Sequence, residues 1–199
     1  ILRQRLDHTN DADLIIDVEY RLGQLYHYQL EDPQRAVDSY EHLLEMDPVH
    51  HDALEELETI HRSQEAWDDL FDVLERQADA TNDPDAQVDN FAQMAMLVEE
   101  MLERPHEAVD LWNRVLEVER DNPDALQELG RLYYQQERWD ELVGILEREL
   151  ELADNDEERL ALHESLGTVW GEKLQTEGPA IDAWRSVLEI EPTHLDGLR

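Results

Sequence analysis

An internal repeat constrains this 199-residue chain more than any other feature. The segment AVDSY at 36–40 recurs as AVDLW at 108–112 and as AIDAW at 180–184, so the interval is 72 residues both times. The register holds without a gap elsewhere, and Trp67, for example, is followed by Trp139. A fixed period of this kind is typical of tandem arrays, in which each copy packs on its neighbours. The sequence therefore predicts an array.

Each 72-residue copy is expected to hold two helix pairs. Apolar residues recur at spacings of three and four, the period of an α-helix with one buried face. Asp or Asn before Pro, as at 32–33, 47–48, 83–84 and 122–123, predicts an N-cap followed by proline at the first helical position. No stretch alternates with a period of two between hairpin turns, so no sheet is predicted. The predicted helices are 12–31, 33–46, 49–63, 65–80, 84–103, 105–119, 122–135, 137–153, 156–175 and 178–190.

These helices group into one continuous array spanning residues 1–199. The expected repeats are about 11–48, 49–82, 83–120, 121–154 and 155–192. In this scheme residues 1–8 complete a preceding helix and 193–199 begin a following one. We therefore expect the chain to be a piece of a longer protein.

A short motif recurs in the first helix of several pairs. Leu-Gly-x-x-Tyr occurs at 22–26 and 129–133, and Leu-Gly-x-x-Trp at 166–170. Helix pairs of about 34 residues with this motif resemble the tetratricopeptide repeat. The resemblance implies an all-α fold, a right-handed α-solenoid (superhelix) of antiparallel helix–turn–helix repeats with a concave inner face. It also implies that Gly23, Gly130 and Gly167 let adjacent helices approach closely, whereas Glu58 departs from the small residue expected in its repeat.

In repeats of this family the first helix of each pair lines the concave groove, which commonly holds a peptide or a partner's helix. Counting from the small residue of each first helix gives the positions expected to face this groove. They are Tyr20, Gln24, His27, Tyr28, Glu55, Thr59, Arg62, Met96, Glu99, Glu100, Gln127, Arg131, Tyr134, Glu164 and Thr168. A solvated inner face without a ligand is the alternative for each of them.

The charge balance narrows the classes of partner. The chain has 16 Lys and Arg against 51 Asp and Glu, a formal net charge of −35. Such a polyanion is repelled by nucleic acids and anionic membrane surfaces, and no apolar run approaches the roughly 18 residues of a membrane span. The negative electrostatic field of the chain favours a protein or peptide partner, with basic peptides among the candidates, and disfavours acidic tails. A second interpretation is adaptation to a salty cell, because the acidity is spread over every repeat.

No catalytic residue, metal ligand or cofactor is predicted. The chain has no cysteine, and it lacks a Gly-rich phosphate loop, a nucleophile elbow and an HExxH motif. His50, His51 and Asp52 form the densest group of potential metal ligands, but a metal site needs three or four convergent ligands. A surface turn is therefore the preferred interpretation of this group.

We expect a non-enzymatic scaffold for protein–protein interaction that binds a peptide or helical segment in the concave groove. The alternative is an accessory or regulatory repeat region of a larger enzyme or sensor whose chemistry lies outside these residues. Self-association through open repeat ends, which carry Ile1, Leu2, Leu195 and Leu198, is a third hypothesis. The absence of cysteine fits the cytoplasm, the favoured compartment, as well as the periplasm.

Overall fold

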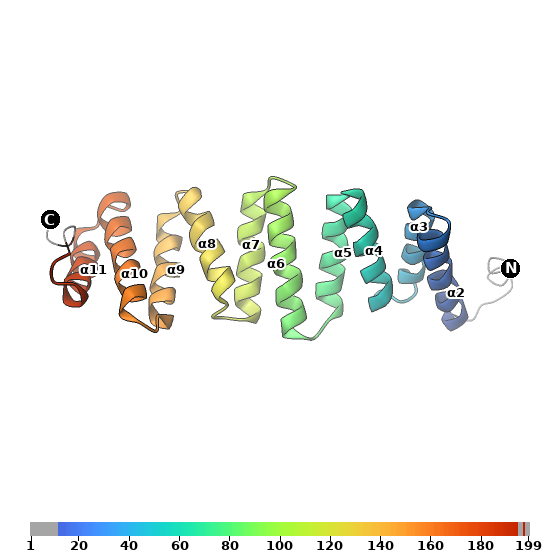
Figure 1. Ribbon diagram of the computed structural model, residues 1–199, viewed down its shortest axis with the longest axis horizontal. Coiled ribbons are helices and arrows are strands. Elements are labelled where there is room, and N and C mark those ends of the chain that lie inside the picture. Colours follow the sequence, from blue (N-terminus) through green and yellow to red (C-terminus); the bar gives the residue numbers. More distant parts are fainter. Residues whose placement is uncertain (1–11, 195–196, 198–199) are drawn as a thin grey trace. The chain divides into compact units, whose positions relative to one another are not determined.

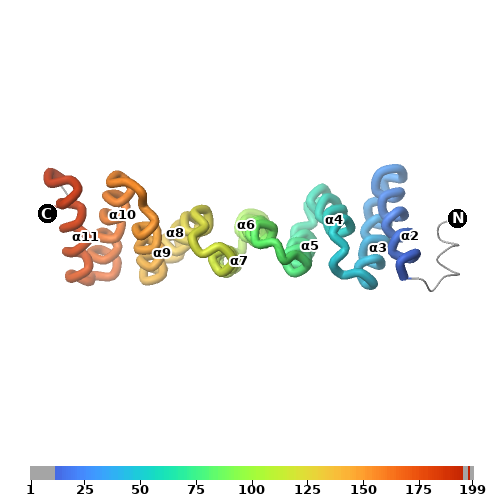
Figure 2. Tube along the Cα trace, turned by 90° about the horizontal axis from the view of Figure 1, so that it is seen from below, coloured from blue at the N-terminus to red at the C-terminus, as the bar shows by residue number. Residues whose placement is uncertain are grey.

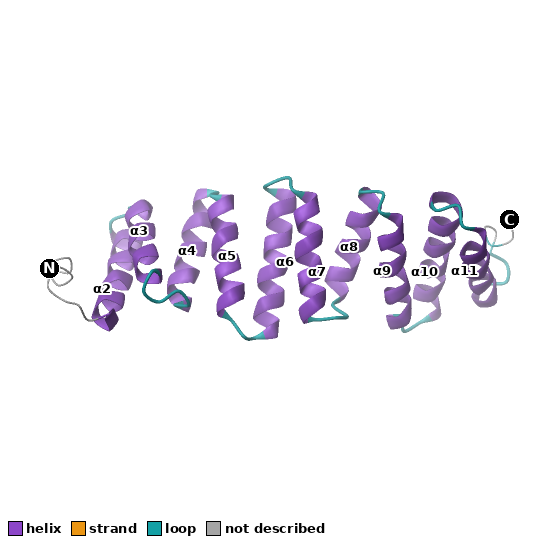
Figure 3. Cartoon of the chain, turned by 180° about the vertical axis from the view of Figure 1, so that it is seen from behind, coloured by secondary structure: helices purple, strands orange, loops and turns teal. Residues whose placement is uncertain are grey.

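In the computed structural model, residues 12–194 and residue 197 are described. Over these residues all regular structure is helical, which confirms the predicted all-α fold of helix hairpins (Figure 1, Figure 3). The chain divides into two compact units: unit 1 ends at Val118 and unit 2 begins at Glu119. The predicted partial repeat at 1–8, most of the one at 193–199, and the four apolar end residues lie outside the described residues. The expectation of one continuous array stays a prediction.

Unit 1 is a series of helices in which each packs on the next one in the chain (Figure 2). Its first helix, α2 (Ala12–Gln24), continues directly into a π-helical turn, η1 (Leu25–Gln29). The others are α3 (Pro33–Leu44), α4 (His51–Gln64), α5 (Trp67–Ala80), α6 (Pro84–Glu100) and α7 (Pro105–Val118). Tyr40, Leu54 and Ile60 are fully buried in the core cluster of α2, α3, α4 and α5.

Unit 2 repeats this arrangement with two further helix pairs. Its helices are α8 (Pro123–Gln135), α9 (Trp139–Leu152), α10 (Asp156–Thr168) with the π-helical turn η2 (Val169–Lys173), and α11 (Glu177–Ile190). Helix α8 packs on α9, α9 on α10, and α10 on α11. Among the described helices of both units, none is long and apolar enough to cross a bilayer.

The starts of several helices follow the predicted capping chemistry. The side chains of Asp32, Asp83 and Asn122 accept backbone N–H groups at the starts of α3, α6 and α8, and proline follows each of them. The same prediction was wrong at 47–48, because α4 begins two residues later than expected. Its cap is His50, whose Nδ1 accepts the backbone N–H of the third residue on, at 3.3 Å. An imidazole nitrogen thus replaces the usual carboxylate or amide oxygen.

The turn inside each described helix pair contains one residue in the left-handed conformation. The φ angles of these residues lie between 50° and 56°, and the residues are Glu31, Glu65, Glu103, Glu137 and Gln175. Positions 31, 103 and 175 are one period apart, as are 65 and 137, so the repeat extends to the conformation of its turns. Glycine ordinarily occupies this conformation at a helix end. Because glycine is absent from these positions, the sequence does not reveal which residue of each turn is left-handed.

Two of the three motif glycines allow close helix packing as predicted. A Cβ atom on Gly23 would lie 2.5 Å from Cζ of Tyr40, and one on Gly167 would lie 2.6 Å from Cε2 of Trp184. The prediction was wrong for Gly130, where a Cβ atom would meet nothing closer than Ile145 Cγ2 at 3.6 Å, an ordinary contact. The reason is that no large aromatic side chain of the next helix packs against Gly130.

Candidate functional site

The predicted groove positions all lie on the first helices of the pairs, and none of them is buried. The structure gathers most of them into three places: an aromatic cluster in unit 1, a pocket in unit 1 and a pocket in unit 2. Glu55, Thr59 and Glu99 line neither pocket. Glu55 pairs with His51 and accepts the hydroxyl of Thr59 on its backbone oxygen, so these side chains are held along their own helix.

The aromatic cluster of unit 1 forms around a carboxylate. The hydroxyl of Tyr28 donates to Glu56 Oε2 at 2.9 Å, and Nδ1 of His27 lies 3.3 Å from the same oxygen. The rings of His27 and Tyr28 are stacked, with centroids 4.4 Å apart. The hydrogen bond to Glu56 raises the pKa of Tyr28, and burial is the main cause that raises the pKa of Tyr20.

Sequence reasoning missed Glu56 and named its neighbour Glu55 instead. The two residues have the same chemistry and lie one position apart on α4. Only the rotation of the helix about its axis decides which carboxylate faces α2 and η1. No local sequence signal distinguishes them.

The α4–α6 pocket of unit 1 is a hollow of about 330 Å³ between α4, α5 and α6. Three predicted groove residues, Arg62, Met96 and Glu100, contribute to its lining. The other lining residues are Trp67, Leu70, Leu74, Gln93, Leu97 and Met101. The concave groove predicted from the sequence includes these three residues, and the pocket gives their surface an apolar floor.

The α8–α10 pocket of unit 2 is larger, about 500 Å³, and contains five predicted groove residues. Its rim is formed by Gln127, Arg131, Tyr134, Glu164 and Thr168. Its other lining residues are Gly130, Leu142, Leu146, Glu149, Ser165 and Val169. An apolar floor with a few polar groups at the rim is the usual make-up of a binding pocket.

The two pockets are the same feature one period apart. Leu70, Leu74 and Leu97 of the α4–α6 pocket correspond to Leu142, Leu146 and Val169 of the α8–α10 pocket. The main difference is at position 58, where the corresponding residue in unit 2 is Gly130. Gln77 donates to the Glu58 carboxylate at 2.9 Å, and Arg62 pairs with it at 2.8 Å. Glu58 therefore occupies space that Gly130 leaves open.

Charges at the rim of the α8–α10 pocket are mostly paired within unit 2. Arg131 pairs with Glu128 at 2.7 Å, and Glu164 pairs with the ring of His194. Glu149 is the exception: it makes no hydrogen bond or ion pair with any described residue, and burial raises the pKa of its carboxyl. Glu149 is thus the carboxylate of this pocket that no described residue contacts through a hydrogen bond or an ion pair.

A second hollow of about 480 Å³ adjoins the α8–α10 pocket. The two share Gln127 and Glu149, and the second hollow adds Leu126, Leu152 and Leu162 to the apolar surface. Together they form an extended groove on unit 2, with Glu149 at its middle. The adjoining hollow was not predicted, because its residues follow no motif that differs from ordinary core positions.

The remaining candidates from the sequence have structural roles. His50 caps α4, and His51 pairs with Glu55 along the same helix at 3.1 Å. No group of three potential metal-binding side chains converges among the residues that the structure describes. Trp139 is half-buried and packs edge-on against Tyr134, with ring centroids 5.4 Å apart, so it supports the rim of the α8–α10 pocket.

One family profile matches part of the chain. The family profile described as "Tetratricopeptide repeat" matches residues 125–160, which lie in unit 2. A search of curated proteins finds no match.

Among solved structures, one similar chain is YrrB, described as a TPR protein with an unusual peptide-binding site. The two chains have 18% identity and a TM-score of 0.47, and the match covers 99% of this chain and 95% of YrrB. The C-terminal part of a TPR repeat-containing protein from Cytophaga hutchinsonii has 14% identity and a TM-score of 0.49, with coverage of 99% and 77%. PilF of Pseudomonas aeruginosa has 16% identity and a TM-score of 0.45, with coverage of 99% and 84%.

Proposed function

We propose that this chain, whose helix pairs are tetratricopeptide repeats, is a non-enzymatic scaffold that binds a segment of a partner protein in the groove of unit 2. The observation that carries the proposal is the α8–α10 pocket, where five residues predicted for the groove surround one apolar floor. Its volume of about 500 Å³ lies within the range of roughly 300–1,000 Å³ that is usual for ligand pockets. The pocket is therefore large enough for one apolar side chain of a peptide or helix.

The shape of the pocket supports an apolar anchor. Leu142, Leu146 and Val169 form its floor, and Tyr134, which is 56% exposed, forms part of its wall. A large apolar side chain that enters such a pocket loses most of its contact with water, which is how anchor residues provide most of the affinity at interfaces. Tyr134 is held by Trp139 and adds a rigid aromatic surface.

The charge of the groove supports a basic residue next to this anchor. Glu149 is half-buried and without a partner among the described residues, so an Arg or Lys of the ligand would compensate it. The net charge of −35 would also steer a basic segment toward the chain before contact. The proposed ligand is therefore a segment in which an apolar side chain and a basic side chain lie close together.

A substitution at Gly130 tests the proposal. Random peptides displayed on phage would be selected on the whole chain, and the affinity of the enriched peptides would be measured for Gly130→Glu. The new side chain fills the pocket as Glu58 does in unit 1, so we expect affinity to fall by about tenfold or more. Gly130→Gln fills the same space without charge and should give a similar loss.

The matched control is Gly144→Glu. Gly144 lies on α9 outside the pocket, and a Cβ atom on it would have nothing within 4 Å. This variant carries the same change in charge and in helix propensity, and it should bind the selected peptides as the parent does. Equal affinity of the parent and Gly130→Glu for every selected peptide would refute the proposal.

A further inference from the structure

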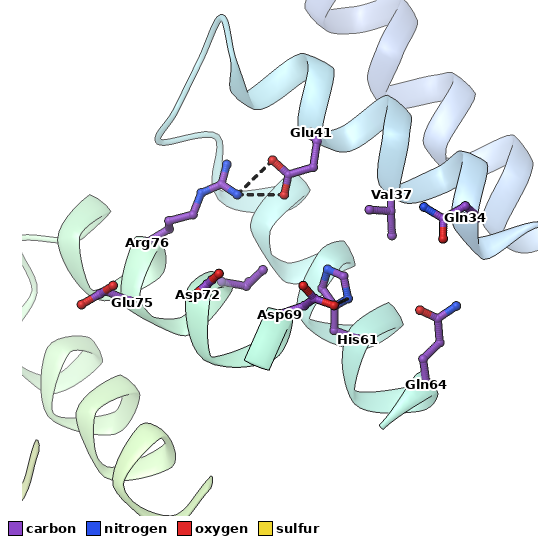
Figure 4. Close-up of a pocket in the computed structure, with 10 residues that line it drawn as sticks. Gln34, Val37, Glu41, His61, Gln64, Asp69, Asp72, Glu75 and Arg76 are labelled. Atoms are coloured by element: carbon purple, nitrogen blue, oxygen red, sulfur yellow. Dashed lines mark hydrogen bonds and ion pairs between the residues drawn. The ribbon is translucent and has the colours of Figure 1, made fainter. Parts of the chain in front are cut away.

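A second hollow of unit 1 lies away from the groove, on the face formed by α3, α5 and the end of α4 (Figure 4). We call it the His61 pocket. It has a volume of about 610 Å³, and its polar lining includes Glu41, His61, Asp69, Asp72 and Arg76. Helices α3 and α5 are second helices of their pairs, whereas the groove pockets are lined mainly by first helices.

His61 is the buried polar group of this pocket. Its residue surface is 7% exposed, and Nδ1 has no hydrogen-bond partner among the described residues. The nearest carboxylate oxygen, Oδ2 of Asp69, lies 4.0 Å from Nδ1, which is too far for a hydrogen bond. Burial lowers the pKa of His61 despite the opposing effect of Asp69, Glu41 and Asp72, so the imidazole is neutral near pH 7. A neutral ring in the Nε2–H form presents a lone pair at Nδ1.

The carboxylates around His61 exceed the cations available to them. Nη1 of Arg76 lies 2.8 Å and 3.0 Å from the two carboxylate oxygens of Glu41, so this guanidinium is already engaged (Figure 4). No lysine or arginine among the described residues pairs with Asp69 or Asp72. The pocket thus combines uncompensated negative charge at its edge with a buried imidazole whose Nδ1 is unpaired among the described residues.

The repeat does not need these residues for packing. One period later, position 61 corresponds to Tyr133 and position 72 corresponds to Gly144. The array therefore accepts an aromatic ring and a glycine where unit 1 has the histidine and one of the aspartates. The chemistry of the His61 pocket is specific to this part of the chain.

We propose that the His61 pocket binds an arginine side chain of a protein partner, with the guanidinium against Asp69 and Asp72 and beside the buried ring of His61. A guanidinium suits these carboxylates because it is planar, always charged and has five N–H donors in fixed directions. Hydrogen bonds from a guanidinium to carboxylates are among the strong ones in proteins. This site is separate from the unit 2 groove and does not depend on the function proposed for it.

The test follows the imidazole nitrogens of His61 by NMR while the whole chain is titrated with N-acetyl-arginine methylamide. We expect a saturable shift of the Nδ1 resonance. N-acetyl-citrulline methylamide has the same shape without the charge and should give no saturable shift. A response to citrulline equal to that of arginine, or no response to arginine, would overturn the proposal.

Two further titrations distinguish arginine from other cations. An equal or stronger response to the lysine analogue would show that the pocket selects charge and not the guanidinium, which contradicts the proposal. The same Nδ1 shift with magnesium chloride alone, at the same ionic strength, would identify a metal site and would also contradict it.

Variants assign the response to the pocket. Asp69→Asn and Asp72→Asn change exposed side chains and should each weaken arginine binding by about tenfold. Asp79→Asn is the matched control, because Asp79 is exposed on the same helix but does not line the pocket. Gly130→Glu should leave the His61 response unchanged, so a failure of the unit 2 groove and a failure of this pocket are distinguishable.

Discussion

The α4–α6 pocket of unit 1 and the α8–α10 pocket of unit 2 have the same position in the repeat but different volumes. Their volumes are about 330 Å³ and 500 Å³, and three floor positions carry leucine or valine in both. In unit 1 the side chain of Glu58 is fixed by Gln77 and Arg62. In unit 2 the corresponding residue is Gly130, and the pocket stays open. One position of the repeat can therefore decide whether a shared hollow is filled from within or left for a ligand.

The difference between Glu58 and Gly130 also affects the residue that would contact position 58 or 130 from the next helix. Gln77 uses its amide to hold Glu58, whereas Glu149, one period later, has no described partner. Opening the pocket in unit 2 thus leaves a half-buried carboxylate without the hydrogen bond that its counterpart has. This carboxylate is the natural contact for a basic ligand, but it carries a desolvation cost while the groove is empty.

The largest expected difference is in the free energy of unfolding of two variants, in which glycines of the same sequence motif are replaced by alanine. Gly23→Ala should destabilise the protein by about 2 kcal/mol, because the new methyl group meets the fully buried ring of Tyr40. Gly130→Ala should stabilise it by about 0.5–1 kcal/mol, because alanine favours the helix and finds only ordinary contacts. Urea denaturation of both variants gives the two free energies of unfolding.

Opposite signs for the two variants would confirm that Gly130 provides space and not close packing. A loss of stability in Gly130→Ala comparable to that in Gly23→Ala would show that our account of the α8–α10 pocket is wrong. Gly144→Ala, on the exposed side of α9, reports the helix-propensity effect alone and serves as the control.

A smaller change in the free energy of unfolding is expected when position 58 of unit 1 receives the glycine found at position 130 of unit 2. Glu58→Gly removes the hydrogen bond from Gln77 and the ion pair with Arg62, and it places glycine inside a helix. We expect a loss of about 1.5 kcal/mol in the free energy of unfolding. The enlarged α4–α6 pocket should also gain affinity for a small apolar probe, which isothermal titration can detect. A variant as stable as the parent would mean that Glu58 does not hold the wall of this pocket.

The smallest effect is expected at Glu149, where Glu149→Gln copies the amide found at position 77. Burial raises the pKa of Glu149 in the folded chain, so the folded state binds a proton more readily than the unfolded state does. The resulting penalty is absent below the unfolded pKa and grows as the pH rises through the folded pKa. We expect Glu149→Gln to be more stable than the parent by about 0.5 kcal/mol at neutral pH.

The difference between Glu149→Gln and the parent should shrink toward about pH 3, where the parent carboxyl is protonated in both states. Comparing two chains that differ at one position removes the large common effect of the other carboxylates. A difference that is constant over this range of pH would exclude burial of the charge as its cause.

Much of the fold could be predicted from sequence because it depends on local chemistry and on a period. The apolar spacing and the Asp-Pro and Asn-Pro pairs located the helices. The resemblance to the tetratricopeptide repeat predicts that the first helices line a groove, and this stays a prediction. The exception at 47–48 shows the limit of this reasoning, since His50 took the capping role that Asp47 was expected to have. The candidate site was predicted as a surface but not as individual pockets.

The sequence by itself determined the helices, their pairing in the chain and the residues on their exposed faces, because each of these follows from spacing along one helix. Only the tertiary structure decided that Glu56 and not Glu55 meets the aromatic cluster, and that Gly130 opens a pocket while Gly23 closes a contact. It also decided that His61 is buried with Nδ1 unpaired among the residues that the structure describes. These facts depend on which side chain of a neighbouring helix faces a given residue. These contacts are determined by how the helices pack on one another, and they cannot be read from the period of the sequence.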